Sequence, residues 1–286
     1  MNNKNFLASL NWVFFGSDRF SIIVLEELLA HGLKPNLIIT TPDKPSGRHL
    51  KLTSPLVKTW ANDHQIECLQ PTEFNSDLLT KLKDQNKFGL VASYGLILPN
   101  KILDLWPAGL LNIHPSLLPK YRGASPIQQT ILSNDNQAGV SLIKLDALMD
   151  HGPIIASQSV PLNQKNYFDL ETELAKLGSK LIIDFLPLYL NNKLELIPQN
   201  HDLATYTKKI TKTDGELDLN DSAKINDKKI RAYINWPGTY FYITKNDKPI
   251  RVKITKAYLD QDQLIIERVI PAGKKEMAWL DFKRNL

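Results

Sequence analysis

The chain has 286 residues, enough for two domains, of which 43% are hydrophobic, 23% are charged and one is a cysteine, Cys68. This composition is typical of folded globular proteins and excludes disordered and fibrous classes, while a single cysteine excludes an intrachain disulfide, a zinc ribbon and an iron–sulfur cluster. The formal net charge of +5 comes from residues 190–286, because residues 1–189 hold equal numbers of acidic and basic side chains. This asymmetry fits a basic module for a polyanion, and it equally fits a solvated surface with extra lysines.

The first two thirds of the chain alternate between strand and helix patterns. Apolar runs predict strands at residues 11–15, 36–40, 66–69, 90–93 and 110–113, and a strand pair at 140–144 and 154–160. Helical periodicity predicts helices at residues 20–30, 56–62, 78–85, 127–132 and 170–190, the last of which contains Pro187, a residue that can break it. This order predicts an α/β fold with a Rossmann-like, mainly parallel sheet between two layers of helices.

The pattern changes after residue 189. Residues 190–206 are polar and poorly periodic, as is typical of a linker, and short β-prone runs follow at residues 239–243, 250–254 and 264–269. We therefore expect an α/β domain over residues 1–189, a linker over 190–206 and a small all-β domain over 207–286. No apolar run reaches 18 residues, and residues 1–16 read as a short polar lead into a strand, without a signal-peptide cleavage pattern. We expect no membrane partner and a cytoplasmic localisation.

Two common kinds of site lack their sequence motifs. The turn after the first strand contains only Gly16, without a glycine-rich phosphate-binding pattern, so neither a dinucleotide site nor a P-loop is predicted. The six histidines do not pair with one another or with Cys68 at metal-ligand spacing, so we expect no metal site.

Residues 109–126 hold the densest set of chemically useful side chains. Asn112 and His114 are two residues apart, so both point to one face of a strand near its carboxyl end, where ligands bind in parallel sheets. An amide beside an imidazole suits stabilisation of a developing oxyanion, and Asp150, in a turn after a later strand, could orient His114 or take a proton through water. Taken alone, the same residues also fit a loop histidine, a turn aspartate and a capping asparagine.

The combination of motifs is more specific than its parts. Asn112-x-His114-x-Ser116-Leu117-Leu118-Pro119-x-x-Arg122-Gly123, followed by Asp150 36 residues after His114, resembles the folate-dependent formyltransferases. Further motifs are similar to the methionyl-tRNA formyltransferases in particular and extend over about residues 12–284. They are the basic loop at residues 41–58, the segment 93–99, Lys209-Ile210-Thr211-Lys212, Trp236-Pro237-Gly238 and Pro271-x-Gly273-Lys274-Lys275.

The resemblance implies both a fold and a reaction. The fold would be a Rossmann-like catalytic domain joined to an OB-like β-barrel, which here looks shortened between Ala257 and Leu264. The reaction would transfer a formyl group from 10-formyltetrahydrofolate to the α-amine of methionine on initiator Met-tRNA, without a metal, and we expect a monomer. Asn112 and His114 would stabilise the oxyanion, and Asp150 would tune His114 and help to remove the amine proton.

The resemblance also assigns binding residues. The folate site would be lined by Tyr94, Gly95, Leu96, Ile97, Leu98, Ser116, Leu117, Leu118 and Pro119. The tRNA would contact the loop at residues 41–58, which carries a local charge of +3 and which its prolines and glycine keep irregular. The proposed tRNA contacts are Lys44, Arg48, Lys51 and Lys58 in this loop and Lys208, Lys209, Lys212 and Arg231 in the basic second domain.

Two further departures from the family pattern stand near the proposed site. Gly16-Ser17-Asp18 replaces the usual Gly-Thr-Pro, and His151 replaces a threonine beside Asp150. His151 could perturb the Asp150 carboxylate or face solvent, and we expect the second. Three rival functions share some of the motifs. The basic loop disfavours a sugar-nucleotide or small-amine formyltransferase, the tRNA-type motifs disfavour a formyltetrahydrofolate hydrolase, and the intact Asn112, His114 and Asp150 disfavour an inactive tRNA-binding protein.

Overall fold

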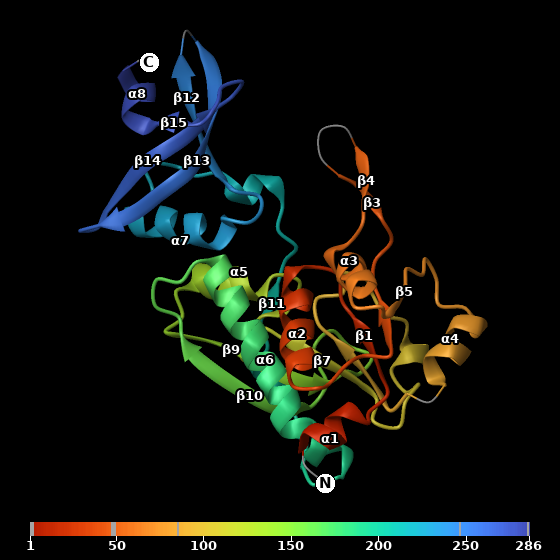
Figure 1. The fold of residues 1–286 in the computed structure, drawn as a ribbon. Coiled ribbons are helices and arrows are strands. Elements are labelled where there is room, and N and C mark those ends of the chain that lie inside the picture. The colour runs from red at the N-terminus through yellow and green to blue at the C-terminus, as the bar shows by residue number, and fades with distance from the viewer. Residues whose placement is uncertain (1–2, 47–49, 85, 246, 285) are drawn as a thin grey trace. The chain divides into compact units, whose positions relative to one another are not determined.

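The computed structural model describes all residues except 1–2, 47–49, 85, 246 and 285. The chain forms two compact units (Figure 1). The first consists of Met1–Arg122, Gly139–Val160 and Glu171–Tyr206, and the second of Gly123–Ala138, Pro161–Leu170 and Thr207–Leu286. The second unit thus includes two segments that precede residue 190, and the boundaries that the sequence favours, at residues 189 and 207, stay a prediction.

A seven-stranded sheet in the order β10-β9-β7-β6-β1-β2-β5 forms the centre of the first unit. The pairs β2–β5, β1–β2, β1–β6 and β6–β7 are parallel, whereas β9 runs antiparallel to β7. This arrangement confirms the Rossmann-like, mainly parallel sheet. The strands are β1 Trp12–Phe15, β2 Leu37–Ile39, β5 Glu67–Leu69, β6 Phe88–Val91, β7 Leu110–His114, β9 Gln137–Lys144 and β10 Ile154–Pro161.

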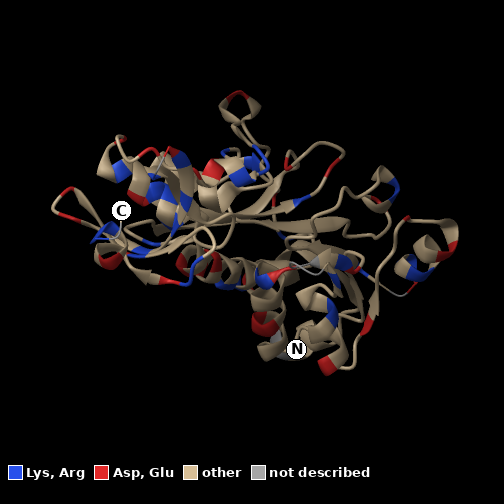
Figure 2. Cartoon of the chain, turned by 90° about the horizontal axis from the view of Figure 1, so that it is seen from above, with Lys and Arg blue, Asp and Glu red and all other residues tan. Residues whose placement is uncertain are grey.

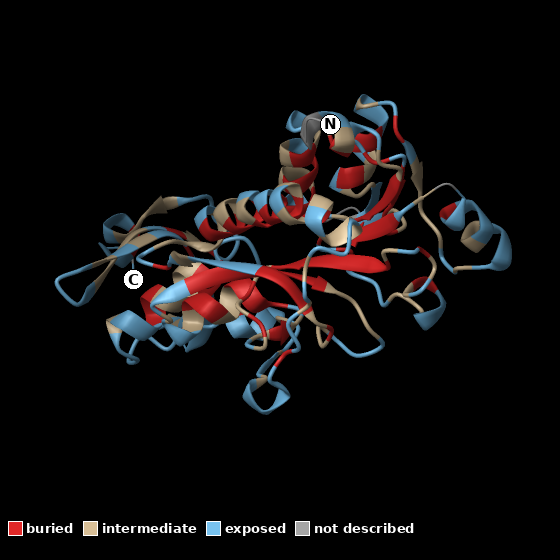
Figure 3. Cartoon of the chain, turned by 90° about the horizontal axis from the view of Figure 1, so that it is seen from below, coloured by how far each residue is buried: buried red, intermediate tan, exposed pale blue. Residues whose placement is uncertain are grey.

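The central strands β1, β6 and β7 are buried along their whole length, as expected for parallel strands covered on both faces (Figure 3). On one face, Phe15 and Leu110 pack with Leu82 of helix α4 (Ser76–Lys83). On the other face, Ile113 lies against Gly178 of helix α6 (Tyr167–Leu190). Because side chains alternate along a strand, Asn112 and His114 share the face of Leu110 and point away from α6.

The helices of the first unit follow the predicted periodicity closely. Asp18 is the N-cap of helix α2 (Arg19–Ala30), and its carboxylate accepts a hydrogen bond from the Ser21 amide in a capping box. Helix α3 spans Leu56–Asp63, and α6 continues through Pro187 to Leu190, because a proline in the last turns removes little of the hydrogen-bond ladder. Within the predicted polar lead into β1, Asn3–Ala8 form helix α1, which the sequence pattern did not predict.

The second unit contains a four-stranded antiparallel sheet in the order β12-β13-β14-β15. Its strands are β12 Thr239–Lys245, β13 Lys248–Asp260, β14 Gln263–Pro271 and β15 Met277–Ala278. The long β13–β14 hairpin closes through Gln261 and Asp262, which both have positive φ, as a two-residue turn requires. Phe241, Val252 and Val269 form its core with Phe282 of helix α8 (Trp279–Arg284).

This antiparallel sheet confirms the small β domain that the sequence predicts, although helices accompany the sheet. Besides α8, the second unit contains helix α7 (Ala223–Tyr233), which is capped by Ser222 and packs against β13, β14 and helix α5 (Pro126–Ser133). The sequence of α7 is polar except for a few positions near its end, such as Ala232 and Tyr233, which are buried. A helix that buries so short an apolar stripe gives a weak periodic signal.

The basic loop is also more regular than the sequence suggests. Strands β3 (Lys44–Ser46) and β4 (Lys51–Thr53) pair as an antiparallel hairpin, in which Pro45 faces Leu52. Proline is tolerated there because each strand of an isolated hairpin has an edge that needs no N–H donor. Arg48, which we expect to contact tRNA, lies between these strands and outside the described residues.

Candidate active site

Asn112 and His114 lie at the carboxyl end of β7, between β6 and β9 in the sheet. Their side chains are buried, with 8% and 5% of their surface exposed. Buried polar groups need hydrogen-bond partners, so their contacts define the chemistry of the site.

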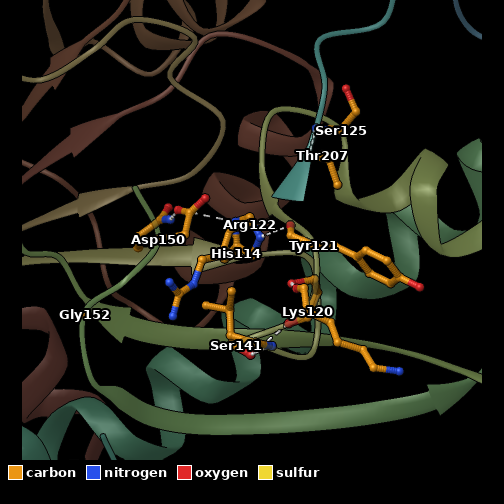
Figure 4. A network of polar contacts seen from close by, with 12 residues as sticks. His114, Lys120, Tyr121, Arg122, Ser125, Ser141, Asp150, Gly152 and Thr207 are labelled. Atoms are coloured by element: carbon orange, nitrogen blue, oxygen red, sulfur yellow. Dashed lines mark hydrogen bonds and ion pairs between the residues drawn. The ribbon is translucent and has the colours of Figure 1, made fainter. Parts of the chain in front are cut away.

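Both side chains meet the same oxygen of Asp150, which is brought to them by the turn after β9. Figure 4 shows His114 facing Asp150. The Asn112 Nδ2 atom donates to Asp150 Oδ1 at 3.3 Å, and His114 Nδ1 lies 3.6 Å from the same atom. The Asp150 side chain is 13% exposed, so the carboxylate is reachable from one side. The structure therefore brings together the three residues that the sequence singles out.

The second nitrogen of His114 determines where its proton lies. His114 Nε2 is 3.0 Å from the carbonyl oxygen of Tyr121, and because a carbonyl can only accept, Nε2 carries a hydrogen. Uptake or release of a proton by the ring thus takes place at Nδ1, the atom that faces Asp150. This arrangement suits a proton that moves between the carboxylate, the imidazole and a reacting group.

The loop at residues 116–119 is held from inside the protein. Ser141 Oγ accepts a hydrogen bond from the Leu118 amide and donates to the Ser116 carbonyl at 2.8 Å, while Ser116 Oγ donates to the Lys120 carbonyl at 2.6 Å. The Leu118 side chain packs with Ile143 and Ile154, and Leu117 lies against Gly139. These hydrogen bonds and apolar contacts hold the backbone of the loop in place next to His114, and Lys120 and Tyr121 follow Pro119 in the chain.

The segment at residues 94–98 splits into a buried and an exposed part. The Tyr94 ring packs edge-on against the Phe15 ring, with the two ring centroids 5.7 Å apart. Burial raises the pKa of the Tyr94 hydroxyl to about 12. Leu96 and Ile97 are exposed, Ile97 to 94%, and Gly95 has a φ of +76° with open space around its Cα. Tyr94 is therefore a core residue, whereas Leu96 and Ile97, with the half-buried Leu98 behind them, offer an apolar surface.

Two negative observations apply to the part of the chain that the structure describes. There, no three histidine, cysteine, aspartate or glutamate side chains gather closely enough to hold a metal ion. No helix within the same residues has the length and apolar character needed to cross a membrane.

Comparisons with known proteins identify the family. The chain matches the formyl transferase family over residues 10–186 and the formyl transferase C-terminal domain over residues 209–264. It is 34% identical to the methionyl-tRNA formyltransferase of Herpetosiphon aurantiacus over 96% of this chain and 97% of that one. The chain belongs to the methionyl-tRNA formyltransferase family. A second relative of the same name, from Chloroflexus aurantiacus, is 38% identical over 84% of this chain and 78% of its own.

Solved structures share the formyltransferase fold. The methionyl-tRNA formyltransferase from Clostridium thermocellum has a TM-score of 0.61 at 18% identity and covers 92% of this chain and 98% of its own. The N-formyltransferase from Helicobacter canadensis, solved with folinic acid and dTDP-3-aminofucose, has a TM-score of 0.66 at 21% identity, covering 94% and 98%. At these identities the likeness establishes the fold alone.

The basic residues that we assign to tRNA in this formyltransferase have different surroundings. Basic and acidic residues are interspersed along the ribbon (Figure 2). Lys58 Nζ contacts both carboxylate oxygens of Asp43, at 3.1 and 3.2 Å, and hydrogen bonds from Gln70 and from Lys58 hold the Asp43 pKa below its usual value. Lys58 therefore anchors the base of the β3–β4 hairpin. Exposed side chains remain at Lys44, Lys51, Lys208, Lys209 and Lys212.

Arg231 is committed to an internal contact of the second unit. Its Nε atom donates to Asp227 at 2.7 Å, one turn earlier in α7, and its Nη1 atom donates to the Lys165 carbonyl at 3.1 Å. Both side chains of the ion pair are largely buried. The assignment of Arg231 to tRNA stays a prediction, and its observed contacts fit a structural role better.

His151 faces solvent only in part, because 29% of its side-chain surface is exposed. Its Nδ1 atom lies 2.6 Å from Asp146 Oδ2, and its ring stacks on His201 with centroids 3.8 Å apart. These contacts turn the ring away from Asp150 toward the segment after α6. Partial desolvation, together with the electrostatic effects of His151 and Arg122, lowers the pKa of His201.

Sequence reasoning missed Gln199, which belongs to the site. The segment at residues 190–206 reads as a linker, yet Gln199 is buried and its amide contacts the Asp150 turn. The sequence could not reveal this role, because Gln199 pairs with Arg122 of the Arg-Gly motif, 77 residues away, and no local pattern predicts such a contact.

Proposed function

We propose that this protein transfers the formyl group of 10-formyltetrahydrofolate to the α-amine of methionine on initiator Met-tRNA, giving N-formylmethionyl-tRNA. The observation that carries the proposal is that Asn112 and His114, at the carboxyl end of β7, both lie against one carboxylate oxygen of Asp150. Relatives named methionyl-tRNA formyltransferase at 34–40% identity support the acceptor. This substrate is consistent with the cytoplasmic localisation that we expect from the sequence.

The three side chains have complementary roles in this reaction. Bound 10-formyltetrahydrofolate would supply the formyl carbon: the amine forms a bond to this carbon, the bond from the carbon to the folate N10 breaks, and tetrahydrofolate leaves with a proton on N10. Asn112 uses one amide hydrogen to hold Asp150, and its second hydrogen can donate to the oxygen on which negative charge develops. His114 stabilises the same charge, and Asp150 takes the proton that the amine loses, directly or through water. A well-aimed donor contributes about 2.7–4 kcal/mol to such a step.

The surroundings of the triad fit a folate. Leu96 and Ile97 follow the carboxyl end of β6, next to β7, and present exposed apolar surface suited to a flat ring. The rigid backbone of Ser116, Leu117, Leu118 and Pro119 would form a second wall, since the side chains of Ser116 and Leu118 point inward. We assign Tyr94 to the support of this site rather than to contact with the ring.

The acceptor stem of the tRNA would be held by positive charge. The β3–β4 hairpin carries exposed Lys44 and Lys51, and the second unit carries exposed Lys208, Lys209 and Lys212. Phosphate contacts of this kind position a nucleic acid without reading its bases. We include Arg48 among these contacts on the sequence alone.

A direct assay tests the proposal. The protein is incubated with 10-formyltetrahydrofolate and, in separate reactions, with Met-tRNA of the initiator type, Met-tRNA of the elongator type, a nucleotide-linked amino sugar, or no acceptor. We expect formylmethionine with initiator Met-tRNA and a much lower yield with elongator Met-tRNA. Transfer to the amino sugar alone, or release of formate without any acceptor, would refute the tRNA function in favour of a sugar formyltransferase or a hydrolase.

A further inference from the structure

The segment after α6 is built into the first unit by a backbone bridge. Ile197 and Ile154 exchange two backbone hydrogen bonds, of 2.8 and 2.9 Å, in antiparallel register. Two residues further on, this register brings Gln199 opposite Gly152, and only 6% of the Gln199 surface is exposed. A segment that looks like a linker thus runs alongside the turn that carries Asp150.

The Gln199 side chain ties together both ends of this turn. Its Nε2 atom donates to the carbonyl oxygens of Asp150 at 2.8 Å and Gly152 at 2.7 Å, so both amide hydrogens are used. Its Oε1 atom accepts from Arg122, whose Nη2 and Nε atoms lie 2.6 and 3.2 Å away. Arg122 is 1% exposed, and its other contacts include His201 Nδ1 and the Tyr206 hydroxyl. Figure 4 shows Arg122, Asp150 and Gly152 within one polar network around His114.

The Asp150 turn needs such support because its backbone is strained. Asp150 has a φ of +47°, a left-handed conformation that is unfavourable for any residue except glycine. Gly152 passes so close to the Lys144 carbonyl that any side chain there would overlap it. A conformation of this kind persists where its surroundings fix it. The two hydrogen bonds from Gln199 hold the turn by the carbonyl oxygens of Asp150 and Gly152, the residues on either side of His151.

We propose that Gln199, anchored by Arg122, is a positioning residue that holds the Asp150 carboxylate against Asn112 and His114. The inference deepens the proposed formyl transfer and rests on it for the effect on turnover. Arg122 serves as the anchor rather than as a substrate contact, because its guanidinium is engaged by Gln199, His201 and Tyr206. Gln199 acts through the backbone of the turn and touches neither Asn112 nor His114 in the contacts described above.

The decisive variant is Gln199→Glu. A glutamate keeps an acceptor for Arg122 but loses both donors and places a negative charge against two carbonyl oxygens. Gln199→Met removes the donors without adding charge, so agreement between the two variants excludes an effect of charge alone. Asn200→Ala is the matched control, because it removes a hydrogen bond to the Asp202 amide within the same segment.

We expect kcat to fall about 10- to 100-fold in both Gln199 variants, because a shift of about 1 Å at a reacting group has effects of this size. The KM values for folate and for tRNA should stay within threefold of the wild type, since neither substrate contacts Gln199. Asn200→Ala should keep the wild-type kcat. A kcat within twofold of the wild type in either Gln199 variant would overturn the proposal.

Amide hydrogen exchange separates positioning from general stability and from the proposed function. In both Gln199 variants, amides at residues 148–153 should exchange at least tenfold faster, while those of β1, β6 and β7 stay as in the wild type. Faster exchange throughout the sheet together with the loss of kcat would mean a structural role and would overturn the proposal. If the wild type formylates no tRNA, the function fails, and the exchange data alone still show whether Gln199 holds the turn.

Discussion

At the scale of single residues, one carboxylate oxygen organises the candidate site. Asp150 Oδ1 accepts a hydrogen bond from the Asn112 amide and lies 3.6 Å from His114 Nδ1, so the amide donor and the imidazole nitrogen meet at the same oxygen. The His114 ring is further fixed by its bond to the Tyr121 carbonyl. Such preorganised donors cost no reorganisation when charge develops in the transition state.

This geometry predicts that His114→Ala and Asn112→Ala each lower kcat about 100- to 1000-fold, the usual effect of losing one oxyanion donor. Binding of tRNA should change little, because neither side chain is exposed enough to contact phosphates. Single-turnover formylation and filter-binding measure the two quantities. His31→Ala, at the exposed end of α2, is the matched control for the histidine. A large loss of tRNA affinity in His114→Ala would contradict the assigned role.

The single cysteine gives a prediction about pH. Burial raises the pKa of the Cys68 thiol to about 11 from an ordinary value of 9.0, so the thiol stays protonated at neutral pH. Alkylation by iodoacetamide at pH 8 should be about 100-fold slower than for an ordinary thiol, because the thiolate is the nucleophile. The rate should rise with pH up to about 11. Equal labelling rates in the native and the denatured chain would show that this pKa is not raised.

At the scale of elements, the contact between α6 and β7 supports the strand that carries Asn112 and His114, on the face of the sheet opposite to these two side chains. Gly178 lies against Ile113, the residue between Asn112 and His114, and against Val140 of β9. The close approach of α6 to the sheet therefore depends on the missing side chain at residue 178. The helix period of α6 was readable from the sequence, but the need for glycine at this position was not, because it arises from a neighbour 65 residues away.

Gly178→Ala accordingly sets two effects against each other. Alanine gains about 1 kcal/mol of helix propensity, whereas overpacking against Ile113 and Val140 costs about 1–3 kcal/mol. We expect net destabilisation in urea unfolding, with Lys176→Ala on the exposed side of α6 as the control. In an Ile113→Ala background the cost should shrink or change sign, because the new methyl group fills space that Ile113 vacates. An equal cost in both backgrounds would disprove the contact.

Other elements show where local patterns succeed and fail. The buried strands β1, β6 and β7 are confirmed because a continuous apolar run is a strong signal for a central parallel strand. The β3–β4 hairpin and α7 were missed for opposite reasons. Prolines hid the hairpin, although its strands tolerate them, and a polar sequence hid the helix, which is stabilised by packing on β13 and α5.

At the scale of the whole molecule, the net charge of +5 suits a polyanionic substrate. Counting charges by domain conceals the lysines of the β3–β4 hairpin, because acidic residues elsewhere in residues 1–189 cancel them. Lys58 and Arg231 form ion pairs with Asp43 and Asp227, which further reduces the number of basic side chains that can bind a polyanion. The exposed lysines are therefore the better candidates for phosphate contacts.

The double variant Lys44→Gln with Lys51→Gln should raise the KM for tRNA and leave the KM for folate unchanged. A plot of log kcat/KM for tRNA against log salt concentration should flatten by about 0.9 per lost phosphate contact. The double variant Lys83→Gln with Lys101→Gln, at exposed positions of α4 and of the 3-10 helix at Asn100–Ile102, controls for the loss of two positive charges. Unaltered KM and slope in the double variant would remove the hairpin lysines from the tRNA interface.

The sequence by itself predicted the mainly parallel sheet and most of the helices of the first unit, because apolar runs and helical periodicity are local properties of the chain. It pointed to Asn112, His114 and Asp150 through the resemblance of its motifs to the formyltransferases. Only the tertiary structure decided that Asp150 meets Asn112 and His114 at one oxygen, that Gln199 and Arg122 hold its turn, and that His151 is directed elsewhere. Apart from the contact of His151 with Asp146, these contacts join residues 36–77 positions apart in the sequence, and only the packing of the sheet brings such segments together.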